Sequence, residues 1–225
     1  MIHPTAIIEN GATIADGVLI GAYAYIGSKV TIGEGTKVGN GSQITGKTTI
    51  GKNNNIFSNV VLGSAPQDLK YKGEETQLVI GDNNTIREFC FFNTGTPGGG
   101  GLTSIGSNSL FMAYVHIAHD CKIGDNCILA NNATLAGHVE LGSFAVIGGM
   151  TPVHQFVKVG DFAMLGGASA ISQDIPPYCL AEGNRAKLRG LNLVGLRRKL
   201  ERSDVDELKR AYKELFLRGK QIGRA

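Results

Sequence analysis

Four of the five histidines of this chain lie between residues 116 and 154, and His119 is followed directly by Asp120. An imidazole titrates near neutral pH, so it can take a proton from a hydroxyl group as that oxygen attacks a thioester. A neighbouring carboxylate can hold the ring and favour the imidazolium that forms. These two residues therefore predict a general base.

Spacing brings further polar groups to the same place. His119, Gly137 and Gln155 are separated by steps of eighteen residues, and the same step separates Asp120 from His138. On a coil with eighteen residues per turn, each set would stack as one column. Gly137 would then lie beside His119, where its N–H could donate to a developing oxyanion with no Cβ in the way.

The hydrophobic pattern predicts such a coil. Ile, Val, Leu or Phe occupies every sixth position in three blocks, which cover residues 2–62, 80–92 and 105–171. A period of six differs from that of a helix and from that of an amphipathic strand, and it is typical of a parallel β-helix built from hexapeptide repeats. Three hexads form one triangular turn with an inward-pointing anchor on each face. We expect an all-β prism with a small α-helical appendage.

The coil also places the two remaining histidines of the cluster. His116 shares a turn with His119, beyond the inward-pointing Ile117, and His154 directly precedes Gln155. Three neutral imidazoles can hold Zn²⁺, so a zinc site is the alternative to a general base. Because the histidines flank a glycine column and have amide and carboxylate neighbours, we expect no metal.

Two segments interrupt the repeat, residues 64–79 and 93–104. Loops that leave a regular solenoid add nothing to its core and often serve binding. The second segment is rich in glycine, but it lacks the strand–helix context of a dinucleotide fingerprint and the lysine of a P-loop. We expect it to be a mobile flap.

The repeat ends near residue 171, and the Pro176–Pro177 pair is expected to close the prism because prolines cannot continue a ladder. We therefore divide the chain into a β-helix over 1–177 and a short helical region over 178–225. The seven basic residues from 185 to 202 form either a solvated helix surface or a docking site for an anionic partner.

Two helices are expected in this last region, the first over residues 191–200. The second would begin at a capping box formed by Ser203 and Asp206 and end near Gly219. Its apolar stripe consists of Val205, Leu208, Tyr212, Leu215 and Phe216.

Composition limits the remaining possibilities. The chain has 32 glycines among 225 residues and no tryptophan, which suits a corner-rich coil with a narrow core. A net charge of +3 is too small to imply nucleic acid as a partner. No apolar run is long enough to span a membrane, and the repeat begins too early for a signal peptide. The four cysteines form no CxxC pair, so we expect reduced thiols in the cytoplasm.

Four motifs carry a family resemblance: QDLKY at 67–71, HIAHDC at 116–121, ILANNATLAGHV at 128–139 and IGGMTPVHQF at 147–156. They closely resemble the bacterial UDP-N-acetylglucosamine O-acyltransferases. The resemblance implies left-handed coils and a cytoplasmic homotrimer with active sites between neighbouring prisms. It implies transfer of an (R)-3-hydroxyacyl group from acyl carrier protein to the 3-hydroxyl of UDP-N-acetylglucosamine, the first step of lipid A synthesis. The donor's phosphopantetheine thioester is used without a further cofactor.

The resemblance also assigns roles to residues of this chain. It makes His119 the general base, Asp120 its support and the Gly137 N–H the oxyanion donor. It implies that seven residues contact the glucosamine, the phosphates or the acyl linkage: Gln67, Asp68, Lys70, His116, His138, His154 and Gln155. It places Asn192 and Arg198 near the uridine diphosphate. Gly167 corresponds to the position that limits the acyl chain, and with no side chain there a long chain is expected.

The chain departs from the family pattern at three places. Val194 stands where some relatives have a Glu near the uracil, and Arg185 stands where some have a His. The chain ends at Ala225, so its helical region is expected to be shorter than in relatives. Because the same base would serve a 3-amino acceptor, the sequence allows either acceptor sugar. An N-acyltransferase, an acetyl-CoA-dependent hexapeptide enzyme and a non-catalytic solenoid are the alternative functions.

Overall fold

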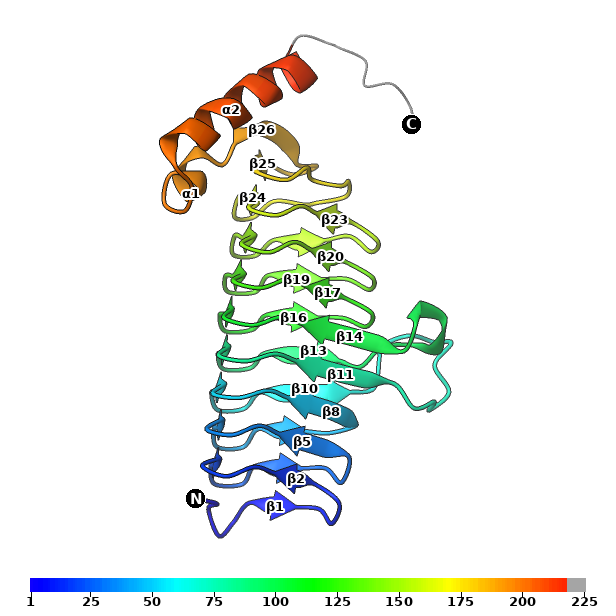
Figure 1. Ribbon diagram of the computed structural model, residues 1–225. Helices are drawn as coiled ribbons and strands as arrows, with labels where there is room; N and C mark the ends of the chain where they lie inside the picture. The colour runs from blue at the N-terminus through cyan, green and yellow to red at the C-terminus, as the bar shows by residue number, and fades with distance from the viewer. Residues whose placement is uncertain (218–225) are drawn as a thin grey trace.

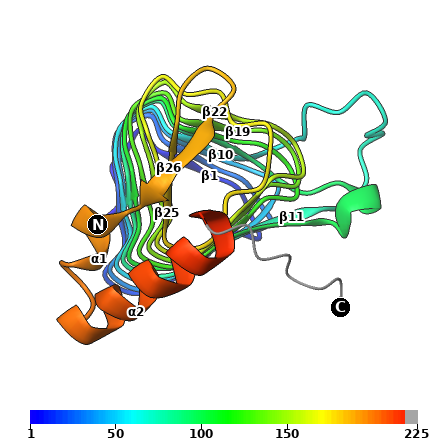
Figure 2. The same cartoon turned by 90° about the horizontal axis from the view of Figure 1, so that it is seen from above.

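The computed structural model describes residues 1–217, in which the anchors form three sheets wrapped into a triangular prism (Figures 1 and 2). The pairing follows the eighteen-residue period, since Ile117 lies beside Leu135 and Leu135 beside Val153. Seen from the C-terminal end, the chain passes clockwise from the first sheet to the second and third as it approaches the viewer (Figure 2). The coil is therefore left-handed, and the expected fold class is confirmed.

Each sheet takes one strand from every turn. The first sheet contains β1 (Ile7–Ile8), β4 (Tyr25–Ile26), β7 (Gln43–Ile44), β10 (Val61–Ser64), β13 (Phe91–Asn93), β16 (His116–Ile117), β19 (Thr134–Leu135) and β22 (Pro152–Val153). The second contains β2 (Thr13–Ile14), β5 (Val30–Ile32), β8 (Lys47–Ile50), β11 (Gln77–Ile80), β14 (Leu102–Ile105), β17 (Lys122–Ile123), β20 (Glu140–Leu141) and β23 (Lys158–Val159). The third contains β3 (Leu19–Ile20), β6 (Lys37–Val38), β9 (Asn55–Ile56), β12 (Thr85–Ile86), β15 (Leu110–Phe111), β18 (Ile128–Leu129), β21 (Val146–Ile147), β24 (Met164–Leu165), β25 (Cys179–Glu182) and β26 (Lys187–Leu191).

The core is a strip of stacked anchors along the prism axis. In the first sheet, Ile44, Leu62, Phe92 and Ile117 are all fully buried. Burying a side chain of this size contributes about 1.5–3 kcal/mol relative to leaving it exposed. Because each anchor packs on the anchors of the turns before and after it, the stack holds the corners in register.

Three corners connect the sheets, and each is named here after one of its residues. The His119 corner joins the first sheet to the second, the Asp161 corner joins the second to the third, and the Gly167 corner joins the third to the first. The second residue of most turns has a left-handed backbone, as at His138 with φ 64° and Phe162 with φ 57°. The N–H of such a residue donates to the preceding turn: His138 N bonds His119 O at 3.0 Å. This repeated bond fixes corner residues as columns.

Two excursions leave the coil, and both do so at the His119 corner (Figures 1 and 2). Residues 65–76 connect β10 to β11, and residues 94–101 connect β13 to β14 with a short 3₁₀ turn, η1 (Pro97–Gly99). Both excursions are shorter than the expected 64–79 and 93–104 because the flanking strands extend into those ranges.

The prediction that the proline pair ends the ladder is wrong. Ile175 bridges Val159 in parallel, and β25 then pairs with β24. Pro177 lies in the turn of the Asp161 corner, where its fixed φ is suitable and no ladder N–H is needed. The third sheet therefore continues to β25, and the antiparallel β26 ends it.

The region expected to be helical from residue 178 thus begins with two strands. Its first helix, α1 (Leu193–Leu196), is shorter than the expected 191–200 because Asn192 caps it, with Oδ1 accepting from Gly195 N at 3.1 Å. It packs at the C-terminal end of the prism together with the next helix (Figure 1).

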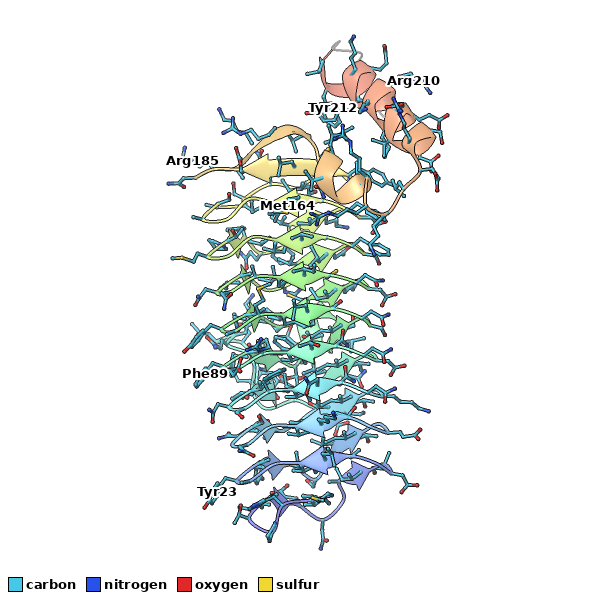
Figure 3. All side chains as sticks on the ribbon, turned by 90° about the vertical axis from the view of Figure 1, so that its left-hand side faces the viewer. Tyr23, Phe89, Met164, Arg185, Arg210 and Tyr212 are labelled. Carbon is cyan, nitrogen blue, oxygen red and sulfur yellow. The ribbon has the colours of Figure 1, made fainter. Side chains whose placement is uncertain are left out.

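The second helix, α2 (Arg202–Tyr212), is continued by a π-helical turn, η2 (Lys213–Leu217). Glu201 is its N-cap and makes no side-chain capping bond, so the capping box expected at Ser203 is wrong. Of the expected stripe, Val205 is buried and Tyr212 packs against the core, as Figure 3 illustrates for Tyr212. The cap expected at Gly219 lies outside the described residues. None of the described helices is long and apolar enough to cross a membrane.

Candidate active site

Asp120, the second residue of its turn at the His119 corner, is almost fully buried beneath the glycine-rich excursion. Its Oδ2 accepts from the Thr96 hydroxyl at 2.6 Å and lies 2.8 Å from His119 Nδ1, while Oδ1 accepts from Thr96 N–H at 2.8 Å. The backbone N–H of Asp120 donates to Thr103 Oγ1 at 2.8 Å. A buried carboxylate requires such donors to offset its desolvation.

The glycine-rich segment is therefore a tied turn over Asp120, not the mobile flap expected from the sequence. A Cβ on Gly99 would lie 2.1 Å from Asp120 Cγ, and one on Gly95 would lie 2.8 Å from Oδ1. Only glycine at these two positions lets the turn approach the carboxylate so closely.

His119 projects from the same turn, and its side chain is 16% exposed. A carboxylate only accepts hydrogen bonds, so Nδ1 must donate to Asp120. In the neutral imidazole, Nε2 then carries the lone pair. The side chain is thus oriented as a base whose accepting atom is not used by Asp120.

Gly137 lies against the His119 ring, as the spacing predicted. A Cβ on Gly137 would lie 2.6 Å from Cε1 and 2.8 Å from Nε2 of that ring. From the sequence we expected a glycine here because it leaves the N–H accessible. The structure gives a second reason, since the His119 ring occupies the space that a Cβ would need.

The Gly137 N–H has no acceptor within residues 1–217. At the Asp161 corner, equivalent N–H groups donate to a side chain of the next turn. Ser107 N donates to Asp125 Oδ1 at 2.6 Å, and Ser143 N donates to Asp161 Oδ1 at 2.7 Å. The next residue in the Gly137 column is Gln155, which makes no such bond. The Gly137 N–H is thus free to meet a ligand oxygen.

His138 completes the cluster. Its ring lies edge-on to His119 with centroids 5.1 Å apart, and it stacks on Phe156 at 4.4 Å. Its Nε2 is 3.9 Å from Asp120 Oδ2. Stacking on Phe156 holds His138 on the outer side of the His119–Asp120 pair.

The same three side chains could also form a metal site. His119, Asp120 and His138 could each offer one ligand atom within 4.8 Å of the others. However, Asp120 Oδ2 already accepts from Thr96 and faces the donor Nδ1 of His119. The donor set therefore fits a hydrogen-bonded acid–base pair better than a cation.

Cys121 adjoins this pair in sequence but does not resemble a nucleophile. Its thiol is buried, and burial raises the pKa of Cys121 to about 12. The reactive thiolate would therefore be a very small fraction at neutral pH.

A pocket of about 390 Å³ opens beside His138, between the two excursions. From the first excursion come Asp68, Lys70, Tyr71 and Glu74, from the second Thr96, Pro97 and Gly98, and from the coil His138 and Phe156. Lys70 forms no ion pair within the described part of the chain, so its ammonium is available to an anionic ligand. The expected residues Asp68 and Lys70 thus join the histidine cluster, whereas Gln67 is exposed and does not line the pocket.

Three further expected residues lie on the neighbouring surface. His116 is on the outer face of β16, where its ring stacks on Phe91 and Nδ1 lies 3.0 Å from the Phe91 carbonyl oxygen. Burial lowers the pKa of His116, and the Phe91 carbonyl opposes that effect. His154 and Gln155 are exposed, and His154 Nδ1 contacts Gln155 O at 3.1 Å.

The remaining three expected residues lie elsewhere on the prism. Gly167 is exposed at its own corner, above Gly149. Asn192 lies at the Asp161 corner, where its Nδ2 donates to Phe162 O at 3.0 Å and its backbone N–H to Tyr178 O at 2.7 Å.

Arg198 follows α1 and is exposed. One chain therefore does not bring Gly167, Asn192 and Arg198 together with His119. Arg185, where the chain departs from the family pattern, lies on the same edge as Tyr23 and Phe89, the edge of the Gly167 corner (Figure 3).

Sequence reasoning missed Thr96, Thr103 and Phe156. Phe156 had a signal, because it continues the Asp120–His138 column by another eighteen residues. Thr103 also had a signal, because it lies in β14 and precedes Cys121 by eighteen residues. Thr96 had none, since an excursion has no repeat from which to place its residues.

Two family models match the chain. One, described as "Udp N-acetylglucosamine O-acyltransferase; Domain 2", matches residues 174–225. The other, described as "Bacterial transferase hexapeptide (six repeats)", matches residues 102–137.

Several named proteins are similar over nearly the full chain. The acyl-[acyl-carrier-protein]–UDP-N-acetylglucosamine O-acyltransferase of Aliarcobacter butzleri is 62% identical over 222 residues, which cover 98% of this chain and 85% of that protein. The protein of the same name from Sulfurovum is 64% identical over 98% of this chain and 85% of its own. The solved structure of UDP-N-acetylglucosamine acyltransferase from Campylobacter jejuni superposes with a TM-score of 0.95 at 55% identity, covering 98% of this chain and 86% of that one.

Proposed function

The chain belongs to the UDP-N-acetylglucosamine O-acyltransferase family, and we propose that it transfers an (R)-3-hydroxyacyl group from acyl carrier protein to the 3-hydroxyl of UDP-N-acetylglucosamine. This reaction is the first step of lipid A synthesis. The donor is the thioester on the carrier's phosphopantetheine, and neither a further cofactor nor a metal is part of the proposal. The proposal places the enzyme in the cytoplasm, the location that the family resemblance implies.

His119 acts as the general base. Its Nε2 takes the proton of the sugar 3-hydroxyl while that oxygen attacks the thioester carbonyl carbon. The carbon–oxygen bond forms, the carbon–sulfur bond of the tetrahedral intermediate then breaks, and the thiolate takes the proton from the imidazolium. Asp120, 2.8 Å from Nδ1, stabilises the imidazolium between these two transfers.

The Gly137 N–H stabilises the oxyanion of that intermediate. It is fixed in a coil turn and has no acceptor within the described residues. A preorganised donor of this kind stabilises the transition state by about 2.7–4 kcal/mol in other acyl transfer enzymes.

The pocket between the excursions binds the acceptor. Lys70 faces the phosphates, and Asp68 with His138 faces the sugar. Gln67, His116, His154 and Gln155 lie around the His119 corner, and the proposal includes them as contacts to the sugar or acyl linkage.

A complete site requires a second copy of the chain, and we propose the homotrimer that the family resemblance implies. Asn192 and Arg198 would bind the uridine diphosphate, yet in one chain they lie toward the Asp161 corner and not beside His119. Gly167, which would set the acyl-chain length, lies at the third corner. Packing prisms side by side brings different corners together. Static light scattering tests this, since a monomer would contradict it.

The observation that carries the proposal is the buried Asp120–His119 pair beside an N–H without an acceptor. The test is a mass-spectrometric assay with UDP-N-acetylglucosamine and 3-hydroxymyristoyl carrier protein. A mass gain of one hydroxyacyl group on the nucleotide sugar is expected. If no product forms with donors of any length, the proposed acceptor is wrong, and the 3-amino sugar is assayed next.

A further inference from the structure

We propose that Thr96 is a positioning residue that fixes the Asp120 carboxylate and, through it, the orientation and tautomer of the His119 imidazole. The proposal rests on the proposed function, in which His119 is the base. It concerns the glycine-rich segment, whose sequence gave no sign of such a role.

Thr96 holds both oxygens of one carboxylate. Its backbone N–H donates to Oδ1 at 2.8 Å and its hydroxyl to Oδ2 at 2.6 Å, and both residues are at most 6% exposed. The plane of the Asp120 carboxylate is therefore set by two donors of a single residue.

The direction of each bond follows from the chemistry of the groups. Because a carboxylate only accepts, the Thr96 hydroxyl must donate to it. The oxygen of that hydroxyl in turn accepts from Gly99 N at 3.2 Å, so the hydroxyl cannot rotate freely. Gly99 N and Gly101 N also donate to Thr96 O, at 3.0 Å and 2.8 Å, which ties Thr96 into η1.

The hydrogen bonds from Thr96 lead through Asp120 to His119. Oδ2, the oxygen held by the Thr96 hydroxyl, is also the one that faces His119 Nδ1 at 2.8 Å. Holding Oδ2 in place keeps the proton on Nδ1 and the lone pair on Nε2. Without the hydroxyl, the carboxylate would retain the backbone donor on Oδ1 but could turn Oδ2 away from the imidazole.

The test compares Thr96→Val with Thr96→Ser in the full chain. Valine has nearly the shape of threonine but no hydroxyl, and serine restores the hydroxyl. Thr94→Val is the matched control, because Thr94 is buried in the same segment and its hydroxyl accepts from Thr76 Oγ1 rather than contacting Asp120. The first readout is NMR of protein labelled with ¹⁵N-histidine, which reports the Nδ1–H of His119 and needs no substrate. The second is kcat and KM for the acceptor sugar.

For Thr96→Val we expect a shifted or exchange-broadened His119 Nδ1–H signal. We also expect a kcat lowered about tenfold, the effect of one hydrogen bond to a charged group, with KM unchanged. Thr96→Ser and Thr94→Val should retain both the signal and kcat.

The proposal is overturned if Thr96→Val keeps the wild-type signal, or if Thr94→Val loses signal and kcat equally, since the segment would then act only through stability. If the wild type forms no acylated sugar, the proposed function fails, and the imidazole signal alone decides the role of Thr96.

Discussion

At the Asp161 corner, the first residue of several turns accepts a backbone N–H of the turn before it. Asp125 and Asp161 accept backbone N–H groups at 2.6 Å and 2.7 Å, and Ser143 Oγ accepts from Asp125 N at 3.1 Å. Behind them, Phe144 and Phe162 stack at 4.6 Å. The side chains of this corner are thus used to hold turns together.

The His119 corner has the same backbone but uses its side chains differently. His119, Gly137 and Gln155 replace the Asp and Ser residues, and the Gly137 N–H has no acceptor in the described chain. Asp120 is bonded to an excursion rather than to the coil alone. The two corners thus differ in what their side chains bond to. At the Asp161 corner they bond to the neighbouring turns, whereas at the His119 corner Asp120 is held by an excursion and the Gly137 N–H is left without an acceptor in residues 1–217.

The largest effect should come from removing the base. His119→Ala should lower kcat by about 10² or more, the range for losing a general base, with the melting temperature unchanged. Steady-state kinetics and calorimetry measure the two quantities. A variant with near-normal kcat would mean that the His119 corner is not where the chemistry occurs.

Gly137→Ala should have the next largest effect. The new Cβ would lie 2.6 Å from the His119 ring, so the ring must move, and kcat should fall about tenfold or more. The matched control is Gly142→Ala at the Asp161 corner, where the Cβ would meet Asp161 N at 2.5 Å. That variant should lower the melting temperature and spare the kcat of the folded enzyme. Equal losses of kcat in both variants would remove the distinction between the corners.

Gly167→Met sharpens the comparison by testing the third corner. A Cβ there meets only Gly149 atoms at 3.4 Å and 3.8 Å, so the variant should fold. A long side chain should shift preference from 3-hydroxymyristoyl to shorter donors several-fold, measured as a ratio of kcat/KM values. Unchanged selectivity would show that this corner does not limit the acyl chain.

The smallest effect on activity is expected from Asp161→Ala. It removes the acceptor of Ser143 N–H and should lower the free energy of unfolding by about 1 kcal/mol, with kcat unchanged. Urea unfolding and steady-state kinetics check both. A large loss of kcat would show that the Asp161 side chain affects the reaction and not only the stability of the turns.

The features that could be predicted from the sequence are those that the repeat determines. The six-residue period gave the prism, and steps of eighteen placed His119 against Gly137 and Asp120 in line with His138. The same reasoning could have added Phe156. In the excursions the repeat is absent, so their contacts with the coil could not be predicted.

The errors are all local and have physical reasons. Pro177 was expected to end the ladder, but it lies at a corner that needs no N–H. The capping box at Ser203 does not form because the N-cap of α2 lies two residues earlier, at Glu201. The glycine-rich flap is held by Thr96, whose partner Asp120 is 24 residues away in sequence and brought near only by the coil.

The most direct test of the central claim is a crystal structure of this chain with the acylated nucleotide sugar bound. We predict that the ester carbonyl oxygen lies within hydrogen-bonding distance of Gly137 N and that the sugar 3-oxygen faces His119 Nε2. The diphosphate should lie near Lys70, beside the pocket between the excursions. A product bound away from the His119 corner, or an ester oxygen facing a different donor, would contradict the account.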